Sequence, residues 1–334
     1  MNNNIVSSSS SDVACNIETP RVLSIQSHVV HGFVGNKCAT FPLWLHGFEV
    51  DAINSVQFSN HTGYSNVEGT KMPSTELTKL YRGLASNGLN YYTHILTGYC
   101  PDAEFLSEVA AIIKDLKSIN PNLVYICDPV LGDYAQGGYY VDPNSMPIYR
   151  DVLVPLANVI TPNQFELQEL SGVTISDETS CLAALEKLHR SSGVRQIIVS
   201  SSELGSGDTT KIHAYASNTV EQEKADATHN GPKGKHVVKF ELDKLPVDFV
   251  GTGDLFSALM LIWSHKTGGN DLKRALGLTL SGVQAVLRDT VETVCKNSAE
   301  NANTKPGFKE LELRIVQNQQ ALLSPVETVK MTDL

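Results

Sequence analysis

The chain has 334 residues, of which 41% are apolar and 19% charged, a composition typical of a soluble globular protein. Its net charge is −10 and its lysines and arginines form no concentrated patch, so we expect no nucleic-acid partner, because phosphate contacts need clustered cations. No segment has the length and apolarity of a membrane span, and the first residues lack the features of a signal peptide.

Cysteine usage and the N-terminal composition indicate the compartment and the domain limits. The six cysteines are scattered and form no C-x-x-C pair, so we interpret them as reduced thiols of a cytosolic protein that binds no membrane. Residues 1–19 are polar and include five consecutive serines, which predicts a disordered tail. We expect residues 20–334 to form a single domain.

Strand and helix patterns alternate along the first 200 residues. Strands are expected at 21–27, 50–56, 94–99, 123–127, 159–160 and 196–199, and helices at 37–46, 75–87, 103–118, from Pro162 to before Gly172, and at 183–189. This alternation predicts an α/β three-layer sandwich, in which a mostly parallel central sheet carries helices on both faces. Ligands of such sheets bind beyond the carboxyl ends of the strands, where this chain has polar residues: Ser27, Thr97, Asp128, Thr161 and Ser200.

The pattern changes after residue 200. Two strands are expected at 211–216 and 236–240, with the polar segment 221–235 between them as a flexible connection or insertion. An apolar helix follows Asp254, a second helix is expected at 272–291, and a final element at 311–321 is expected to dock on the core.

A short glycine-rich stretch, Gly251-Thr252-Gly253-Asp254, leads directly into the apolar helix. The free N–H groups of a helix start, together with the helix dipole, form an anion site, and glycine lets a ligand come close to the backbone. At such a site Asp254 could accept the proton of an alcohol whose oxygen attacks a phosphorus atom. The alternative is that Asp254 only caps the helix.

Two pairs of polar residues follow the strands at 123–127 and 159–160. Asp128 and Asp133 could hold Mg²⁺ directly or through water, or they could simply form hydrogen bonds within a turn. Asn163 and Glu166 lie three residues apart at a helix start. Glu166 could therefore complete a capping box or orient a hydrated metal ion.

The loop at 133–141 contains adjacent glycines, Gly137 and Gly138, followed by Tyr139 and Tyr140. The glycines could act as a hinge and the tyrosines could cover a site, which would exclude water as a competing phosphoryl acceptor. The loop could equally be a mobile surface loop. The P-loop sequence of a common class of nucleotide hydrolases is absent from the chain.

Together these stretches resemble the ribokinase-like superfamily, whose signature is a G-A/T-G-D sequence at a late helix start. More specifically, the chain resembles the pyridoxal kinase family of the eukaryotic type. The resemblance is carried by residues 21–29, 54–64, 96–99, 127–133, 160–166 and 249–256, and it covers the chain from residue 21 to about 290. The serine-rich tail and the segment 203–235, which we interpret as a variable insertion, depart from it.

The resemblance implies a cytosolic homodimer with ATP and pyridoxal, pyridoxine or pyridoxamine as substrates, phosphorylated on the 5′-hydroxymethyl group. It implies that Asp254 is the general base and that Gly251, Thr252 and Gly253 form the anion hole. The residues implied to bind the vitamer, besides Asp254, are Ser27, Val34, Thr62 and Tyr99.

The resemblance also implies a site for metal-bound ATP. Asp133 and Glu166 would organise Mg²⁺, and Asp128 and Thr161 would lie near a monovalent cation such as K⁺. The ATP site would comprise Asp133, Tyr140, Thr161, Asn163, Glu166, Ser200, Ser201, Phe249 and Val250 as well as the anion hole.

Two other functions stay open at this point. The chain could be a hydroxymethylpyrimidine or sugar kinase on the same fold, which would differ around Ser27 and Thr62, because these residues shape the acceptor pocket. It could instead be a catalytically silent vitamin-binding protein. The presence of Asp133, Glu166 and Asp254 argues against that second reading.

Overall fold

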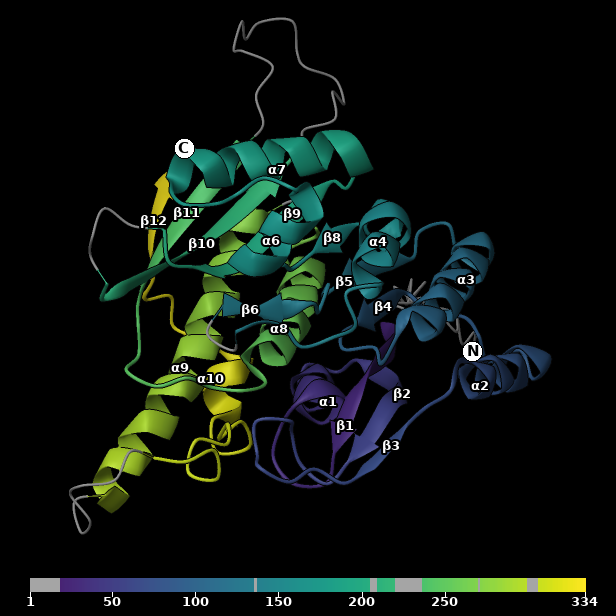
Figure 1. Cartoon of the computed structure of the whole chain (residues 1–334), viewed down its shortest axis with the longest axis horizontal. Coiled ribbons are helices and arrows are strands. Elements are labelled where there is room, and N and C mark those ends of the chain that lie inside the picture. Colours follow the sequence, from purple (N-terminus) through teal and green to yellow (C-terminus); the bar gives the residue numbers. More distant parts are fainter. Residues whose placement is uncertain (1–18, 135–136, 205–208, 220–235, 270, 299–305) are drawn as a thin grey trace, which may run out of the picture.

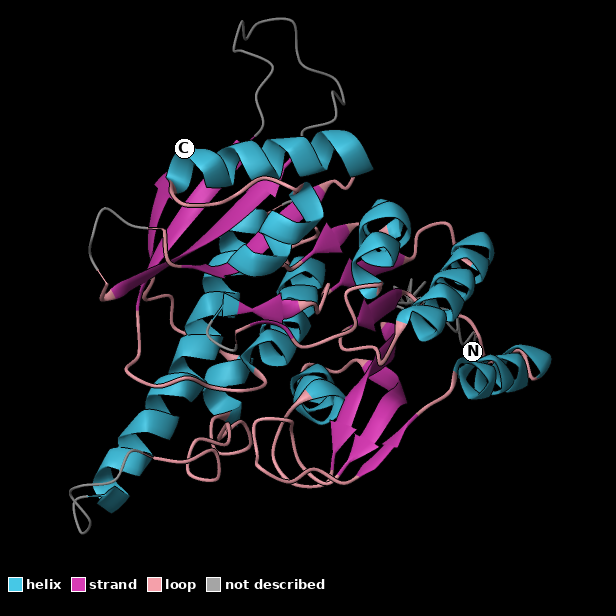
Figure 2. Cartoon of the chain, in the orientation of Figure 1, coloured by secondary structure: helices cyan, strands magenta, loops and turns pink. Residues whose placement is uncertain are grey.

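A computed structural model of the chain describes residues 19–134, 137–204, 209–219, 236–269, 271–298 and 306–334. Within these residues the strands form one large sheet and a small hairpin, and helices cover both faces of the large sheet (Figures 1 and 2). The expected tail, apart from residue 19, and the expected segment 221–235 lie outside the described residues.

The large sheet has the order β12-β11-β10-β9-β8-β5-β4-β1-β2-β3. Its strands are β1 (Arg21–Val29), β2 (Glu49–Phe58), β3 (Gly69–Lys71), β4 (His94–Thr97), β5 (Val124–Cys127), β8 (Val159–Ile160), β9 (Gln196–Ser202), β10 (Lys211–Asn218), β11 (His236–Asp243) and β12 (Lys330–Asp333). Neighbouring strands pair in parallel along the series β2-β1-β4-β5-β8-β9. By contrast, β3, β10, β11 and β12 pair antiparallel with their neighbours. The predicted mostly parallel sheet is confirmed.

Helices pack against both faces of this sheet. They are α1 (Gly35–Leu45), α2 (Ser74–Ser86), α3 (Ala103–Ile119), α4 (Ser145–Ile148), a π-helical turn (Tyr149–Leu153), α5 (Val154–Leu156), α6 (Gln164–Ser171), α7 (Glu178–Ser192), α8 (Thr252–Lys266), α9 (Leu272–Ser298) and α10 (Gln319–Leu323). One apolar core joins the sheet to α2 through α7, and a second joins it to α1, α8, α9 and α10. The three-layer sandwich is therefore confirmed.

The central strands are apolar on both faces because both faces are covered. In β1, Leu23 and Ile25 belong to the core beneath α3, whereas Val22 belongs to the core beneath α1 and α8. Tyr125 and Ile126 of β5 divide in the same way. This continuous apolar pattern fixes the register that brings the carboxyl ends of the parallel strands to one edge.

Local signals set the ends of the helices. Helix α7 begins at Glu178, five residues before the predicted start at 183, because Asp177 caps it and forms a capping box with Ser180. It ends at Gly193, whose φ of 73° is left-handed. The sequence therefore predicted this helix correctly but gave it too few residues at both ends.

Several short elements were not predicted, namely β3, β12, the hairpin of β6 (Gly132–Asp133) and β7 (Gly138–Tyr139), and the helical turns at 145–156. The segment at 311–321 docks as expected, with Leu311, Leu313 and Ile315 buried, but it is mostly irregular chain before α10. The five described cysteines are free. Among the described helices, none combines the length and apolarity needed to cross a membrane.

Candidate active site

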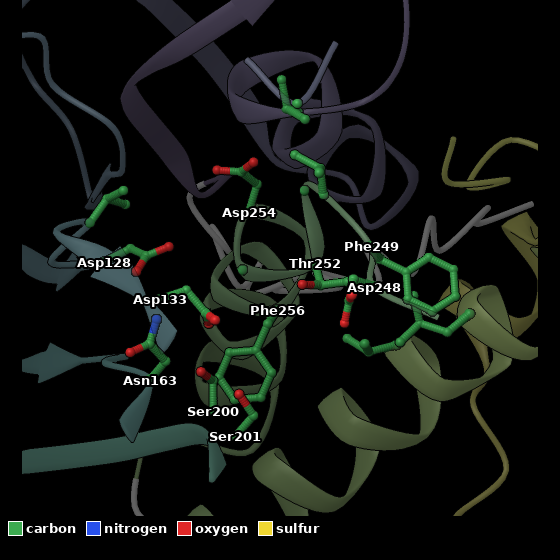
Figure 3. Close-up of a pocket in the computed structure, with 18 of the residues that line it drawn as sticks. Asp128, Asp133, Asn163, Ser200, Ser201, Asp248, Phe249, Thr252, Asp254 and Phe256 are labelled. Carbon is green, nitrogen blue, oxygen red and sulfur yellow. The ribbon is translucent and has the colours of Figure 1, made fainter. Parts of the chain in front are cut away.

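A cavity of about 1040 Å³ lies beyond the carboxyl ends of the parallel strands (Figure 3). All the site residues expected from the sequence line it: Ser27, Val34, Thr62, Tyr99, Asp128, Asp133, Tyr140, Thr161, Asn163, Glu166, Ser200, Ser201, Phe249, Val250, Gly251, Thr252, Gly253 and Asp254. The fold thus brings them together from parts of the chain that are far apart in sequence, while their individual roles stay predictions.

Asp254 lies in the first turn of α8, but it does not cap that helix. The N-cap is Gly251, and in the described structure no side chain makes the capping hydrogen bond. The Asp254 carboxylate instead accepts a hydrogen bond from the backbone N–H of Gly35, with 2.7 Å between N and Oδ2. Because Gly35 is the first residue of α1, two helix starts meet at this carboxylate.

The surroundings of Asp254 adjust its acidity. Burial raises the pKa of Asp254 to about 6, and the Gly35 N–H opposes this rise because it stabilises the charged form. At neutral pH the carboxylate is therefore mostly ionised, yet it is a stronger base than an exposed aspartate. Both properties suit a group that accepts a proton from an alcohol.

The glycine turn before α8 packs directly against the turn before α1. Gly251 has a φ of 88°, and a Cβ atom at this position would lie 2.3 Å from the backbone oxygen of Phe33. Any side chain at 251 would therefore push the two turns apart. A glycine is needed here both for its backbone conformation and for this close approach.

Glu166 completes a capping box at the start of α6, so the capping alternative is confirmed. Its Oε2 accepts from the N–H of Asn163 at 2.9 Å, and its Oε1 accepts from the N–H of Leu131 at 3.0 Å. Burial raises the pKa of Glu166 to about 8 despite these hydrogen bonds. Glu166 therefore holds the loop after β5 against α6, and a further role toward a metal stays a prediction.

Asp128 adds another buried carboxyl group directly after β5. Burial raises its pKa well above the ordinary value, and the negative charges of Glu166 and Asp254 raise it further. Figure 3 shows Asp128, Asp133 and Asp254 around one side of the cavity. The site therefore gathers several buried carboxyl groups that hold their protons more tightly than exposed ones do.

Among the described lining residues, few side chains could balance the negative charge of these carboxyl groups when they are ionised. Lys244 is the one lysine or arginine among the described lining residues, and its Nζ lies 2.7 Å from Oε1 of Glu203. In the described chain, no three His, Cys, Asp or Glu side chains converge closely enough to hold a metal ion by themselves. The buried hydroxyl of Thr161, however, has no hydrogen-bond partner among the residues that the structure describes. The oxygens of these carboxyl groups and of Thr161 could serve as ligands of a cation that also binds phosphate oxygens and water, as Mg²⁺ commonly does.

The acceptor side of the cavity contains residues that the sequence did not reveal. Thr62 lies between His61 and Gly63, which also line the cavity, and Phe308 reaches the same wall from the C-terminal segment. The ring of Phe308 meets that of His61 edge-on, with 5.3 Å between the centroids. Since these residues are far apart in the chain, no local pattern could have assigned Phe308 to the site.

The part of the cavity predicted to bind the nucleotide also has lining residues beyond those expected. Helix α9 contributes Leu280, Val283 and Leu287 together with Gln284, and the strands β10 and β11 contribute Ile212 and Leu242. Leu280, Val283 and Leu287 have the spacing of one helix face, which by itself indicates only a buried stripe. The sequence thus contained a signal for burial but none that distinguished a ligand from the core.

The hairpin formed by β6 and β7 corresponds to the predicted flap at 133–141, of which residues 135–136 lie outside the described structure. Tyr139 packs edge-on against Phe165 of α6, with 5.0 Å between centroids, and its hydroxyl donates to Glu169 at 2.6 Å. Tyr140 remains 43% exposed and lines the cavity. The hairpin is thus docked on α6, which places Tyr140 beside the acidic side of the site.

Comparison with known proteins gives consistent matches. The family model described as phosphomethylpyrimidine kinase matches residues 45–299. The pyridoxal kinase of Sus scrofa is 44% identical over 94% of this chain and 95% of its own length, and that of Arabidopsis thaliana is 41% identical over 94% of each. The structure of pyridoxal kinase from Leishmania donovani in complex with ADP and pyridoxamine superposes with a TM-score of 0.81 at 31% identity, over 94% of this chain and 99% of that one.

Proposed function

We propose a mechanism for this chain, which belongs to the pyridoxal kinase family and is an ATP-dependent kinase of vitamin B6 compounds. Its substrates are pyridoxal, pyridoxine and pyridoxamine, and the group phosphorylated is the 5′-hydroxymethyl. The observation that carries the mechanism is the buried carboxylate of Asp254, held by the Gly35 N–H at the meeting point of two helix starts.

In this mechanism Asp254 is the general base. The 5′-oxygen of the vitamer attacks the γ-phosphorus of ATP, its proton passes to the carboxylate, and the bond from the γ-phosphorus to the bridging oxygen breaks to release ADP. The backbone N–H groups of Gly251, Thr252 and Gly253 form the anion hole for the transferred group. The helix start is suited to this because its first N–H groups have no partners within the helix.

The acidic residues opposite Asp254 would hold the cations that accompany ATP. Asp133 and Glu166 would orient Mg²⁺, in part through water, and Asp128 and Thr161 would lie near a monovalent cation such as K⁺. Support comes from the scarcity of cationic side chains in the site and from the unpartnered Thr161 hydroxyl among the described residues. Bound Mg²⁺ would neutralise phosphate charge as it builds up during the transfer.

The remaining residues would bind the two substrates. Ser27, Val34, Thr62 and Tyr99 would form the vitamer pocket. The nucleotide would contact Asn163, Ser200, Ser201, Phe249 and Val250, with Tyr140 on the flap over it. We further propose that residues 20–334 act as one domain and that the protein works as a homodimer in the cytosol, as the family resemblance implies.

The test is the release of ADP, followed by a coupled assay, with pyridoxal, hydroxymethylpyrimidine and ribose compared at equal concentrations. We expect turnover with pyridoxal to exceed that with the other two alcohols by orders of magnitude. Hydroxymethylpyrimidine is included because the matching family model is described as a phosphomethylpyrimidine kinase. Preference for that alcohol would reassign the acceptor pocket, and ADP release with none of them would indicate a silent binding protein.

A further inference from the structure

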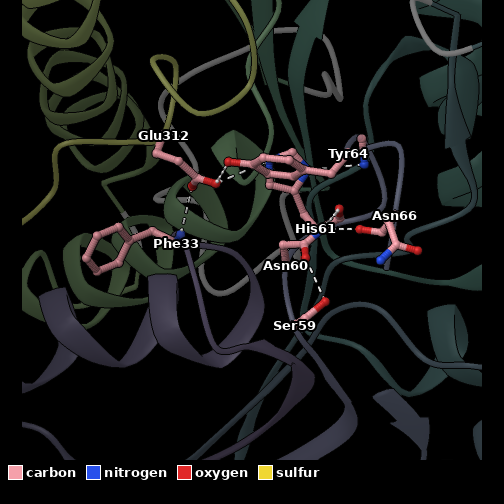
Figure 4. A network of polar contacts seen from close by, with 8 residues as sticks. Phe33, Ser59, Asn60, His61, Tyr64, Asn66 and Glu312 are labelled. Atoms are coloured by element: carbon pink, nitrogen blue, oxygen red, sulfur yellow. Dashed lines mark hydrogen bonds and ion pairs between the residues drawn. The ribbon is translucent and has the colours of Figure 1, made fainter. Parts of the chain in front are cut away.

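The carboxylate of Glu312, in the C-terminal segment, joins two loops that begin far away in the chain (Figure 4). Its Oε2 accepts from the backbone N–H of Phe33 at 3.2 Å, and its Oε1 accepts from the hydroxyl of Tyr64 at 3.0 Å. The same Oε1 lies 3.4 Å from Nε2 of His61. One side chain thus contacts the turn between β1 and α1 and the loop after β2.

The fit around this carboxylate is close. A Cβ atom at Gly32 would lie 2.2 Å from Oε2 of Glu312, so the turn before α1 is pressed against the carboxylate. The side chain of Glu312 is only 15% exposed. Phe308, from the same segment, packs on the rings of both His61 and Tyr64. A half-buried carboxylate with this many partners is held in one position and holds its partners in turn.

Both loops that Glu312 joins form walls of the cavity. The turn before α1 carries Val34, and the loop after β2 carries His61, Thr62 and Gly63, all of which line it. Glu312 itself is absent from the lining, so it acts on the cavity only through these loops.

We propose that Glu312 is a positioning residue that sets the shape of the acceptor pocket by holding the Phe33 turn and the His61–Tyr64 loop against each other. The inference rests on the proposed function, because it assumes that this wall binds the vitamer. Glu312 has no part in the proton transfer and none in nucleotide binding. Its removal should therefore loosen vitamer binding and leave the other steps nearly intact.

The catalytic base has an anchor that does not depend on Glu312. Asn36, next to Gly35, donates to the backbone oxygen of Ile53 at 2.8 Å and accepts from the Ser24 hydroxyl at 2.7 Å. The start of α1 is therefore tied to β1 and β2, and the Gly35 N–H should keep its place beside Asp254. For this reason we expect the effect to appear in KM for the vitamer rather than in kcat.

The first test is Glu312→Gln, which keeps the size of the side chain but removes its charge toward His61 and replaces one acceptor oxygen with a donor. We expect the KM for pyridoxal to rise about tenfold, while the KM for ATP and kcat change less than about threefold. Glu310→Gln is the matched control, because it removes one exposed charge from the same turn but keeps an oxygen that can accept from the Gly307 N–H. Its kcat and both KM values should match the wild type. Equal rises in both KM values, or an unchanged pyridoxal KM, would overturn the proposal.

The second test uses Tyr64→Phe, which deletes one hydroxyl and serves also if Glu312→Gln does not fold. We expect this variant to raise the pyridoxal KM by itself. If Glu312 acts through the loop, the fold-increase in pyridoxal KM of the double variant Glu312→Gln/Tyr64→Phe should be well below the product of the fold-increases of the two single variants. Effects that multiply in full would show that the two residues act independently. A failure of the proposed function has a different signature, since it would appear as normal turnover in Asp254→Asn.

Discussion

The raised pKa of Asp254 leads to a prediction about the pH dependence of turnover. A carboxyl group with a pKa of about 6 is roughly nine-tenths protonated at pH 5 and cannot then act as a base. We therefore expect kcat/KM for pyridoxal phosphorylation, which reports the free enzyme, to fall about tenfold between pH 8 and pH 5. A carboxyl with the ordinary value of 3.8 would stay more than nine-tenths ionised at pH 5, so the rate would barely change.

The variant Asp254→Asn tests the same reasoning from the other side. The asparagine keeps an oxygen that can accept from the Gly35 N–H, so the turn before α1 should stay in place. Only the proton acceptor is lost, and general-base catalysis is worth about two to four orders of magnitude in rate. This loss corresponds to about 3–5 kcal/mol in the barrier.

The assay is the initial rate of ADP release with ATP and pyridoxal both well below their KM values, measured from pH 5 to pH 9 for both proteins. The vitamer and ATP also titrate in this range, and they do so equally for wild type and variant. The ratio of the wild-type kcat/KM to that of the variant therefore isolates Asp254, and we expect this ratio to shrink about tenfold as the pH falls from 8 to 5. A ratio that stays constant with pH, or near-normal turnover in Asp254→Asn, would refute the assignment of Asp254 as the base.

Three further predictions address stability, the metal and the acceptor pocket. Burial raises the folded-state pKa of Asp254 above its unfolded value, so the ionised group destabilises the folded chain above about pH 6, and this penalty is relieved as the pH falls. At pH 8 the free energy of unfolding of Asp254→Asn should therefore exceed that of the wild type by up to about 3 kcal/mol. Calorimetry should show this as a higher melting temperature, with a gain that shrinks toward pH 5. Asp133→Ala should raise the Mg²⁺ concentration needed for half-maximal rate, and an unchanged Mg²⁺ titration would remove Asp133 from the metal site. Ser27→Ala and Thr62→Val should each raise the pyridoxal KM about tenfold with kcat and the ATP KM nearly constant, whereas a rise confined to the ATP KM would assign them to the nucleotide.

The parts of the fold that the sequence predicted are those whose signals are local. The apolar runs of the central strands, the polar residues at their ends and the glycine turn before Asp254 are each contained in a few consecutive residues. Since parallel strands all end at the same edge, this sufficed to gather Ser27, Asp128 and Thr161 in one place. The common direction of the parallel strands, together with the motifs at their ends, made this part of the site predictable.

The parts that were missed depend on partners far away in the chain. The short strands β3 and β12 exist because β2 and β11 offer them edges, and their own residues carry little strand signal. Phe308 and Glu312 reach the site across roughly 250 positions, and the lining face of α9 has the same spacing as a core stripe. Likewise, the sequence left open whether Asp254 caps α8. In the structure its carboxylate accepts from the N–H of Gly35 instead, more than 200 positions earlier.

The contact between Glu312 and the loops near the other end of the chain has a consequence for synthesis. The ribosome makes Ser27, Thr62 and Asp254 well before it makes Phe308 and Glu312. A nascent chain can therefore contain all three while the cavity proposed for the vitamer still lacks one wall. A fragment that stops before residue 306 would lack these contacts, and it would also lose Leu313 and Ile315 from the core on which α8 packs. The C-terminal segment is therefore made last but completes both one wall of the cavity and the core that supports α8.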